Sequence, residues 1–358
     1  MHLLTLVLWV SGILTLFSVL LLAVILGVRS ETDRQVRSRE NFQSLARPLL
    51  GRFVVGCTSL EEILTLLGKH PGMAAEFLIR ECSRRDAPDR SLLRPLIEAL
   101  GCTSSAEAEL TSRNRDRRLR AAETLGYLGT ERSAAFLRTA LGDKVLGVRF
   151  AAAEALARLG SSQDVGEILK AIDVKGEVSQ RRAAEVILIL GRAASEPVLS
   201  LLTEPRGSVN SLAIAIRVAG SLHLREATEP LRHLLSHGEV NVRLNAVRAL
   251  ASIGDPSAVE SIAPLALDES WEVRSAVMQA LGKLEATGHI PLLLRGLSDG
   301  QWWVRFNAAR ALHDLGDPGI SALKEASEHL TDPFGRDISL QVLEEHGTMK
   351  KIEGGKHP

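Results

Sequence analysis

Histidine and cysteine are the residues of this 358-residue chain whose types and spacing most directly suggest chemistry. His233 and His237 are four residues apart, so on a helix they share one face and could provide two ligands to a metal ion. No third ligand accompanies them, and we interpret the pair as surface or interface histidines. Cys57, Cys82 and Cys102 match no zinc or redox spacing, and we expect them to be buried free thiols.

The sequence lacks the local motifs that position a nucleophile, a phosphate group or a catalytic metal. It contains no glycine-rich phosphate loop, no GxSxG turn, no HExxH helix and no CxxC pair. We therefore expect no catalytic residue, no metal and no cofactor.

Aspartate and arginine recur together at a spacing of six residues. The pairs are Asp143 with Arg149, Asp268 with Arg274, and Asp299 with Arg305. An aspartate in a turn can cap the helix that follows and pair with an arginine one turn into that helix. If helices that carry this pattern stack on one another, the pairs line up as a ladder that holds the stack together, and we interpret these residues in that structural role. A carboxylate-rich active site is the alternative.

Charge and composition limit the fold and the partners. The chain has 43 basic and 43 acidic side chains, so its formal net charge is zero and no overall field attracts nucleic acid. Apolar residues make up 45% of the chain and aromatic residues only 4%. Because Leu, Ala, Arg and Glu dominate, the composition favours helices over strands. An all-α protein with a full core is expected.

A pattern of thirteen residues recurs through the second part of the chain. Its windows start at positions 117, 148, 179, 208, 242, 273, 304 and 335. The step between starts is constant except around the fourth window, where a shorter step precedes a longer one. Apolar residues in each window follow the spacing of a helix that buries one broad face, as in VRFAAAEALARLG from position 148. The sequence between windows predicts a partner helix, so each repeat consists of two antiparallel helices.

Two details of the windows bear on how the helices end and stack. Most windows end in a glycine, which can adopt the left-handed conformation that ends a helix. These glycines are Gly129, Gly160, Gly191, Gly254, Gly316 and Gly347. Gln180 and Val209 replace the arginine of the third and fourth windows, where the step also changes. We expect a change of curvature there.

Helix, tight turn and helix, repeated at this constant period, resembles the HEAT repeat family, in particular its short bacterial variant, the PBS-lyase-like HEAT repeats. The resemblance covers residues 117–347 and implies a right-handed α-solenoid of about seven to eight repeats, whose second helices line a concave binding face. The non-core residues predicted on that face are polar and mildly basic, which suits an acidic peptide or helix. They are Asn245, Arg248, Gln279, Lys283, Asn307 and Arg310.

Tryptophan recurs at one position near the start of the predicted second helices. Trp271 and Trp302 share this position, and Trp303 follows the second of them. Exposed tryptophans at the edge of a repeat could anchor a partner, whereas buried ones would pack between adjacent repeats. Both readings remain open from the sequence.

The N-terminal residues predict a membrane anchor. Residues 3–28 carry no charged side chain, and a helix of that length spans roughly 39 Å against a hydrocarbon core of about 30 Å. A cleaved signal peptide would need a positively charged start and a shorter apolar stretch. Several arginines follow the segment and predict an N-out, single-pass orientation with the solenoid in the cytoplasm, as at a bacterial inner membrane. They are Arg29, Arg34, Arg37, Arg39 and Arg47.

The remaining segments complete the predicted organisation and function. Residues 1–28 form the anchor, 29–44 a polar linker or helix extension, 45–113 a helical cap of degenerate repeats, 114–349 the solenoid and 350–358 a polar tail. We predict a scaffold or adaptor that binds a membrane-associated or cytoplasmic protein and meets the lipid bilayer through residues 3–28. Nucleic acid and small molecules are not expected partners. An enzyme resembling bilin lyases and a nucleic-acid-binding solenoid are the alternatives.

Overall fold

The computed structural model describes residues 2–84, 92–173, 176–204 and 207–347. All regular elements among these residues are helices or 3-10 turns, without a strand, which confirms the predicted all-α class. The chain divides into two compact units, one formed by residues 1–111 and 127–129 and the other by residues 112–126 and 130–358. The predicted polar tail, residues 350–358, lies outside the described residues.

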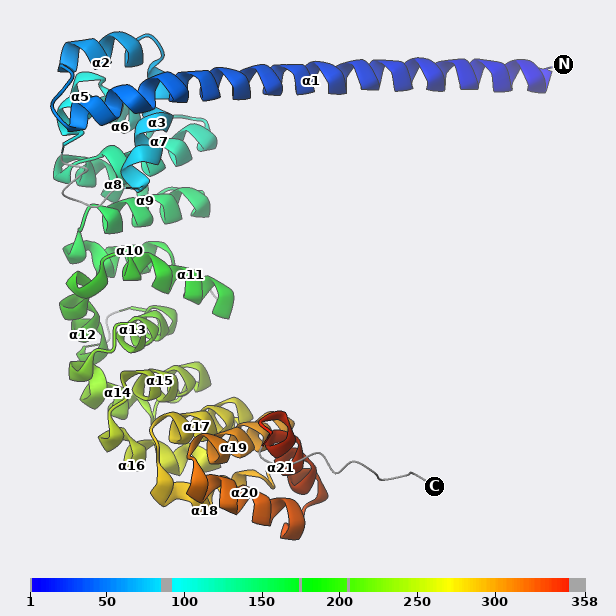
Figure 1. Ribbon diagram of the computed structural model, residues 1–358, viewed down its shortest axis with the longest axis vertical. Helices are drawn as coiled ribbons and strands as arrows, with labels where there is room; N and C mark the ends of the chain where they lie inside the picture. Colours follow the sequence, from blue (N-terminus) through cyan, green and yellow to red (C-terminus); the bar gives the residue numbers. More distant parts are fainter. Residues whose placement is uncertain (1, 85–91, 174–175, 205–206, 348–358) are drawn as a thin grey trace. The chain divides into compact units, whose positions relative to one another are not determined.

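The first unit is built around the C-terminal part of one long helix, α1 (His2–Val54) (Figure 1). Phe42, Ala46 and Leu50 of α1 are buried in a core that includes Ile63, Phe77 and Leu96. Because α1 continues through residues 29–44, that polar segment is a helix extension and not a separate linker. The other helices of this unit are α2 (Leu60–Leu67), α3 (Pro71–Ser83), α5 (Arg94–Ala99) and α6 (Cys102–Glu109).

The described apolar side chains near the start of α1 are exposed. Trp9, Phe17 and Leu20 are 73%, 61% and 63% exposed. Most other side chains of residues 3–28 lie outside the described part of the structure. Among the described residues, no single helix has both the length and the apolar composition to cross a bilayer. Two shorter stretches, Ser179–Leu188 and Gly191–Thr203, have that length and apolar composition only when they are taken together, and a bend of 111° separates them.

The second unit is a series of helix pairs that follow one another in chain order (Figure 1). Each pair has a first helix, generally short and opened by a 3-10 turn, and a second helix of 12 to 14 residues. The first helices are α8 (Ala134–Ala140), α10 (Val165–Ala171), α12 (Ser195–Thr203), α14 (Thr228–Leu234), α16 (Val259–Ile262), α18 (Ile290–Gly296) and α20 (Asp317–His329). The second helices are α7 (Arg115–Leu128), α9 (Leu146–Arg158), α11 (Glu177–Leu188), α13 (Val209–Ser221), α15 (Val240–Ile253), α17 (Trp271–Lys283), α19 (Trp302–Asp314) and α21 (Pro333–Glu345). The 3-10 turns are η1 (Glu131–Ser133), η2 (Ser162–Asp164), η3 (Gly191–Ala194), η4 (Arg225–Ala227), η5 (Pro256–Ala258), η6 (Ala263–Leu267) and η7 (Thr287–His289).

Small residues set the distance between neighbouring second helices. A Cβ atom placed on Gly220 would lie 2.9 Å from Cα of Ala249, and one on Gly282 would lie 2.9 Å from Cα of Ala311. Real side chains do not approach so closely, so glycine allows these backbones to touch. Beside these contacts, the apolar residues Leu250 and Leu281 are fully buried. The predicted periodic apolar face therefore forms the core of the stack.

Left-handed residues mark the ends of the second helices and correct the predicted repeat register. Five of the six predicted glycines have positive φ, and Gly129 does not. His223 (φ 50) and Glu285 (φ 51) occupy the same place in the two other repeats. The left-handed residues recur at a nearly constant step, at positions 160, 191, 223, 254, 285, 316 and 347.

The fourth window therefore starts at position 211 and not at 208. Gly220, the last residue of the window that starts at 208, lies within α13 and packs against Ala249. With this start the steps before and after the fourth window become nearly equal, so the irregular spacing behind the predicted change of curvature is absent. Leu212, and not Val209, holds the arginine position of this repeat, and it is buried.

Candidate protein-interaction surface

Three buried ion pairs connect consecutive repeats of the second unit. In each pair, Nε and Nη2 of an arginine donate to the two carboxylate oxygens of an aspartate in the next repeat. The pairs are Arg118 with Asp143, Arg243 with Asp268, and Arg274 with Asp299, at 2.6–3.0 Å. No side chain in these pairs is more than 19% exposed. We call these residues the ladder.

The ladder side chains also bind the backbone of the turns between helices. Nη1 of Arg274 donates to the carbonyl oxygen of Asp268, six residues earlier, at 2.9 Å. The carboxylate of Asp268 accepts a hydrogen bond from the N–H of Ser270 at 2.9 Å. Each ladder aspartate therefore fixes the turn before its own second helix and joins that turn to the preceding repeat.

The ladder differs from the predicted one in its partners. We predicted that Asp143 pairs with Arg149 and that Asp299 pairs with Arg305, each within one repeat. The carboxylates instead contact the arginine of the preceding repeat, and the arginine of the same repeat reaches only the backbone carbonyl. Arg149 donates to the carbonyl of Asp143 at 2.9 Å, and Arg305 to that of Asp299 at 2.7 Å. The turn N–H orients the carboxylate away from its own helix, which the six-residue spacing does not reveal.

Burial and hydrogen bonding act in opposite directions on the pKa of the ladder aspartates. Burial raises the pKa of Asp143, Asp268 and Asp299, but hydrogen bonds from the paired arginine and from the turn N–H outweigh it and hold each pKa below its ordinary value. These carboxylates are ionised at neutral pH. A general acid or base needs a pKa near the working pH, so the ladder suits a structural role better than the alternative of an active site.

Two further polar contacts between repeats were not predicted. Nε of Arg138 donates to both carboxylate oxygens of Asp164 at 2.9 and 3.0 Å. Gln180, which replaces the ladder arginine in α11, donates to Asn210 at 3.0 Å and accepts from Asn241 at 3.3 Å. The signal available in the sequence was the glutamine itself, because an uncharged amide at a buried ladder position requires polar neighbours.

The predicted partner-binding residues divide into an exposed and a buried group. Arg248, Gln279, Lys283 and Arg310 are exposed on α15, α17 and α19. Asn245 and Asn307 are only 3% and 6% exposed, so their assignment to a binding face is wrong. The side-chain amide of Asn245 donates to Asn241, and that of Asn307 donates to Ser275 at 2.7 Å. Both are buried in the packed stack, which the period of a single helix could not show.

Arg248, Gln279 and Arg310 hold the same position on three successive second helices. We call this position, followed from helix to helix, the central row, and its charge changes sign along the chain. Glu123 and Glu185 are exposed there in the early repeats, and Arg248 and Arg310 in the late ones. Arg217 of α13 is half-buried at the same position and donates to Asn245 at 3.2 Å. The late part of the central row is therefore basic, while the whole chain is neutral.

Aromatic side chains gather beside the late end of the central row. Trp302 stacks on Phe306 with ring centroids 4.9 Å apart and an interplanar angle of 11°, and Trp303 meets Trp302 edge-on at 4.7 Å. Trp302 and Trp303 are 43% and 53% exposed. Trp271 is half-buried, so the two tryptophans at the same repeat position differ. The guanidinium of Arg310 lies 5.7 Å from the centre of the Phe306 ring.

The histidine and cysteine predictions have mixed outcomes. Nδ1 of His237 accepts from the N–H of Glu239 at 3.0 Å, and His233 is exposed. Among the described residues, no group of three or more His, Cys, Asp or Glu could hold a metal ion. Cys82 and Cys102 are buried, as predicted, but Cys57 is exposed because it lies in the turn after α1.

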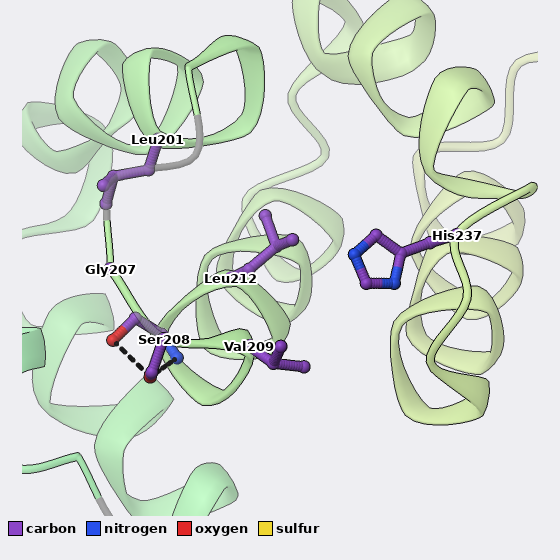
Figure 2. A pocket seen from close by; sticks show the side chains of 7 residues that line it. Leu201, Gly207, Ser208, Val209, Leu212 and His237 are labelled. Atoms are coloured by element: carbon purple, nitrogen blue, oxygen red, sulfur yellow. Dashed lines mark hydrogen bonds between the residues drawn. The ribbon is translucent and has the colours of Figure 1, made fainter.

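A pocket of about 150 Å³ lies beside the start of α13. Figure 2 shows the side chains of Leu212, Val209 and His237 around it, and Ser208 bonded to the helix start. Ser208 accepts from the N–H of Ser211 at 3.1 Å and so caps α13. The volume is below the roughly 300–1,000 Å³ of small-molecule sites.

Comparisons with solved structures give remote matches. YibA from Escherichia coli is 15% identical, with 76% of this chain and 96% of that chain covered and a TM-score of 0.43. The complex of CpcE and CpcF of phycocyanin lyase from Nostoc sp. PCC7120 is 17% identical, with 68% and 94% covered and a TM-score of 0.31. Importin beta is 16% identical, with 83% and 47% covered and a TM-score of 0.49.

A comparison with curated proteins finds no match. A family model described as HEAT repeats matches residues 103–189, 195–270 and 262–344, which together make up more than half of the chain. The matched residues include all three ladder pairs and the late central row. The chain therefore belongs to the HEAT repeat family.

Proposed function

We propose that this protein is a membrane-anchored scaffold whose second helices bind an acidic segment of a partner protein. The observation that carries the proposal is the late central row, in which Arg248, Gln279 and Arg310 are exposed in register on three neighbouring helices. Their sequence neighbours on the same helices are largely buried, so the row is the outward edge of the stack. Membership of the HEAT repeat family supports this function, because stacked repeats present extended binding surfaces.

The chemistry of the row favours a carboxylate-bearing partner. Arginine is enriched at protein interfaces, where it forms two parallel hydrogen bonds to a carboxylate. Arg310 also lies over an aromatic ring, which positions its guanidinium at the edge of the exposed Trp302 and Trp303 side chains. Large aromatic side chains next to arginine are the combination that most often dominates binding energy.

Crosslinking and affinity capture from native membranes test the scaffold proposal. The full-length protein should capture one dominant protein, identified by mass spectrometry. Changing Arg248→Glu and Arg310→Glu together should reduce that capture at least about tenfold, because two favourable charge contacts become repulsive. The matched control is Arg225→Glu with Arg295→Glu, two exposed arginines of η4 and α18. Equal loss in the control, or no loss in the row variant, would count against the central row.

The membrane anchor is the second part of the proposal. Residues 3–28 carry no charged side chain, and the described apolar side chains there, such as Trp9 and Leu26, are at least half exposed. A bilayer would remove this apolar surface from water. The arginines that follow residue 28 support an orientation with the repeats in the cytoplasm.

Cys57 gives a direct test of both anchoring and orientation, because it is exposed and follows α1. A membrane-impermeant maleimide should not label Cys57 in intact cells and should label it once the membrane is opened. The protein should resist extraction by alkaline carbonate, and deletion of residues 2–28 should release it. Labelling of intact cells would reverse the orientation, and release of the full-length chain by carbonate would refute the anchor.

A further inference from the structure

We propose that Arg305 is a receptor for a carboxylate side chain of an extended partner peptide, whose neighbouring apolar side chain packs on the exposed aromatic cluster of α19 and α21. The inference rests on the proposed scaffold function and names the chemistry of the segment bound at its C-terminal end. The aromatic cluster consists of Trp302, Trp303, Phe306 and Phe334.

The ladder supplies the first step of the argument, because Arg305 lacks the aspartate that its counterparts bind. Arg243 and Arg274 each bind the aspartate at the matching position of the next repeat. The equivalent residue for Arg305 is Leu330, which has no carboxylate. Arg305 therefore holds the position of a ladder arginine, but an apolar residue holds the position of its aspartate.

The backbone at Leu330 nevertheless has the geometry of a ladder aspartate. Leu330 has φ −62 and ψ 134, against φ −57 and ψ 144 at Asp268. Its carbonyl oxygen accepts from Nη1 of Arg336 at 2.7 Å, as that of Asp268 accepts from Arg274 at 2.9 Å. The turn is thus preserved and only the carboxylate is missing.

The hydrogen bonds of the Arg305 guanidinium differ from those of the arginines at the same position in other repeats. Its Nε is buried and has no hydrogen-bond partner among the described residues. By contrast, Nε of Arg274 donates to the carboxylate of Asp299 at 2.8 Å, and Nε of Arg149 donates to the carbonyl of Ala171 at 2.7 Å. A buried donor without a partner costs about 1–3 kcal/mol. A carboxylate from outside would satisfy Nε and Nη2 together.

An exposed aromatic ring packs against the face of the Arg305 guanidinium. The guanidinium carbon of Arg305 lies 5.3 Å from the centre of the Phe334 ring, and Phe334 is 64% exposed. Phe334 is in the first turn of α21, so rotation of its side chain needs no movement of the helix. The ring can move aside to admit a carboxylate and then pack against the peptide.

The remaining aromatic side chains define what accompanies the carboxylate. Trp302, Trp303 and Phe306 lie within three residues of Arg305 on α19, and the two tryptophans are about half exposed. Such a surface binds large apolar side chains and leaves the peptide backbone extended across it. The acidic side chains Asp299 and Asp332 precede α19 and α21, which disfavours a polyanion such as nucleic acid. The structure therefore favours an acidic residue beside an aromatic or aliphatic one.

Selection of displayed random peptides on the full-length protein in detergent micelles tests the inference. Bound peptides should carry Asp or Glu next to a large apolar residue. A fluorescein-labelled synthetic copy of the strongest binder should lose at least about tenfold in affinity when Asn or Gln replaces that acid, as expected for a paired charge. Selection of basic peptides, of peptides without an acid, or of none would overturn the inference.

Three variants locate the site. Arg305→Gln and Trp303→Ala should each weaken binding of the labelled peptide at least about tenfold. Leu330→Asp should do the same by supplying an internal carboxylate to Arg305, and it should not lower the thermal midpoint, so misfolding cannot explain the loss. Unchanged binding to the Leu330→Asp variant, or binding lost only through unfolding of the variants, would refute the role of Arg305.

The outcomes also separate this inference from the scaffold proposal. Arg225→Gln should leave binding of the labelled peptide within about twofold, because Arg225 is exposed on η4, outside both the central row and the aromatic cluster. If a native partner is captured through the central row but equally well by Leu330→Asp, the scaffold proposal stands and this inference fails. If the peptide binds at Arg305 but no native protein is captured, this inference stands and the scaffold proposal fails.

Discussion

Asp268→Ala should be among the most destabilising single changes in the repeats. The carboxylate of Asp268 accepts hydrogen bonds from Nε and Nη2 of Arg243 at 2.7 and 2.9 Å, and from the N–H of Ser270 at 2.9 Å. Both side chains of the pair are at most 10% exposed. Removing one partner of a buried pair leaves the other charge uncompensated and costs about 3–5 kcal/mol.

Glu229→Ala provides the matched control within the same unit. Glu229 pairs with Arg232 one helical turn away, and its side chain is 69% exposed. Exposed pairs contribute about 0–1 kcal/mol, so the difference between the two variants should be at least about 2 kcal/mol. Urea unfolding followed by circular dichroism measures the total loss. Hydrogen exchange should show the opening at α15 and α17, because repeat stability depends on contacts between neighbours.

The pH dependence of the same pair provides an independent check. The pKa of Asp268 is lowered in the folded protein: burial raises it, but the bonds from Arg243 and Ser270 outweigh burial. Its stabilising contribution is therefore present above the ordinary aspartate pKa of about 3.9 and is lost as pH falls through the lower folded pKa. Asp268→Ala should flatten this acid dependence. A loss no larger than that of Glu229→Ala, with an unchanged acid limb, would refute the ladder as a source of stability.

Four further substitutions test other parts of the repeats. Burial, and then the neighbouring His346 with its ring centroid 4.1 Å away, lower the pKa of His313. The free energy of unfolding should therefore fall as pH drops below about 6.5. His313→Gln should make this fall with pH smaller, as measured by urea unfolding at each pH. Glu285→Gly should leave the free energy of unfolding unchanged or raise it by up to about 1 kcal/mol, because φ is +51 there. Gly254→Ala should lower it by about 1 kcal/mol. Gly282→Leu should cost at least about 1–3 kcal/mol by overpacking against α19; an unchanged denaturation midpoint would contradict the close helix contact.

Some features of the site were predictable from local sequence and others were not. The exposed residues Arg248, Gln279 and Arg310 followed from their place on the polar face of one helix. Asn245 and Asn307 did not, because whether a residue at the edge of that face meets water depends on the neighbouring helix. Phe334 was missed because it belongs to the cluster only through contact between α19 and α21.

Local sequence was sufficient to predict the all-helical class, the repeat, most helix-ending glycines and the buried face of each second helix. These features follow from short-range rules, since the helical period and the left-handed preference of glycine act within a few residues. The folded stack was needed to show that Asp268 pairs with Arg243 and not with Arg274, that Gly220 packs inside a helix interface and that His223 ends α13 in its place. Those outcomes depend on how closely and at what register successive repeats stack, which is a property of the packed interface and not of any single repeat.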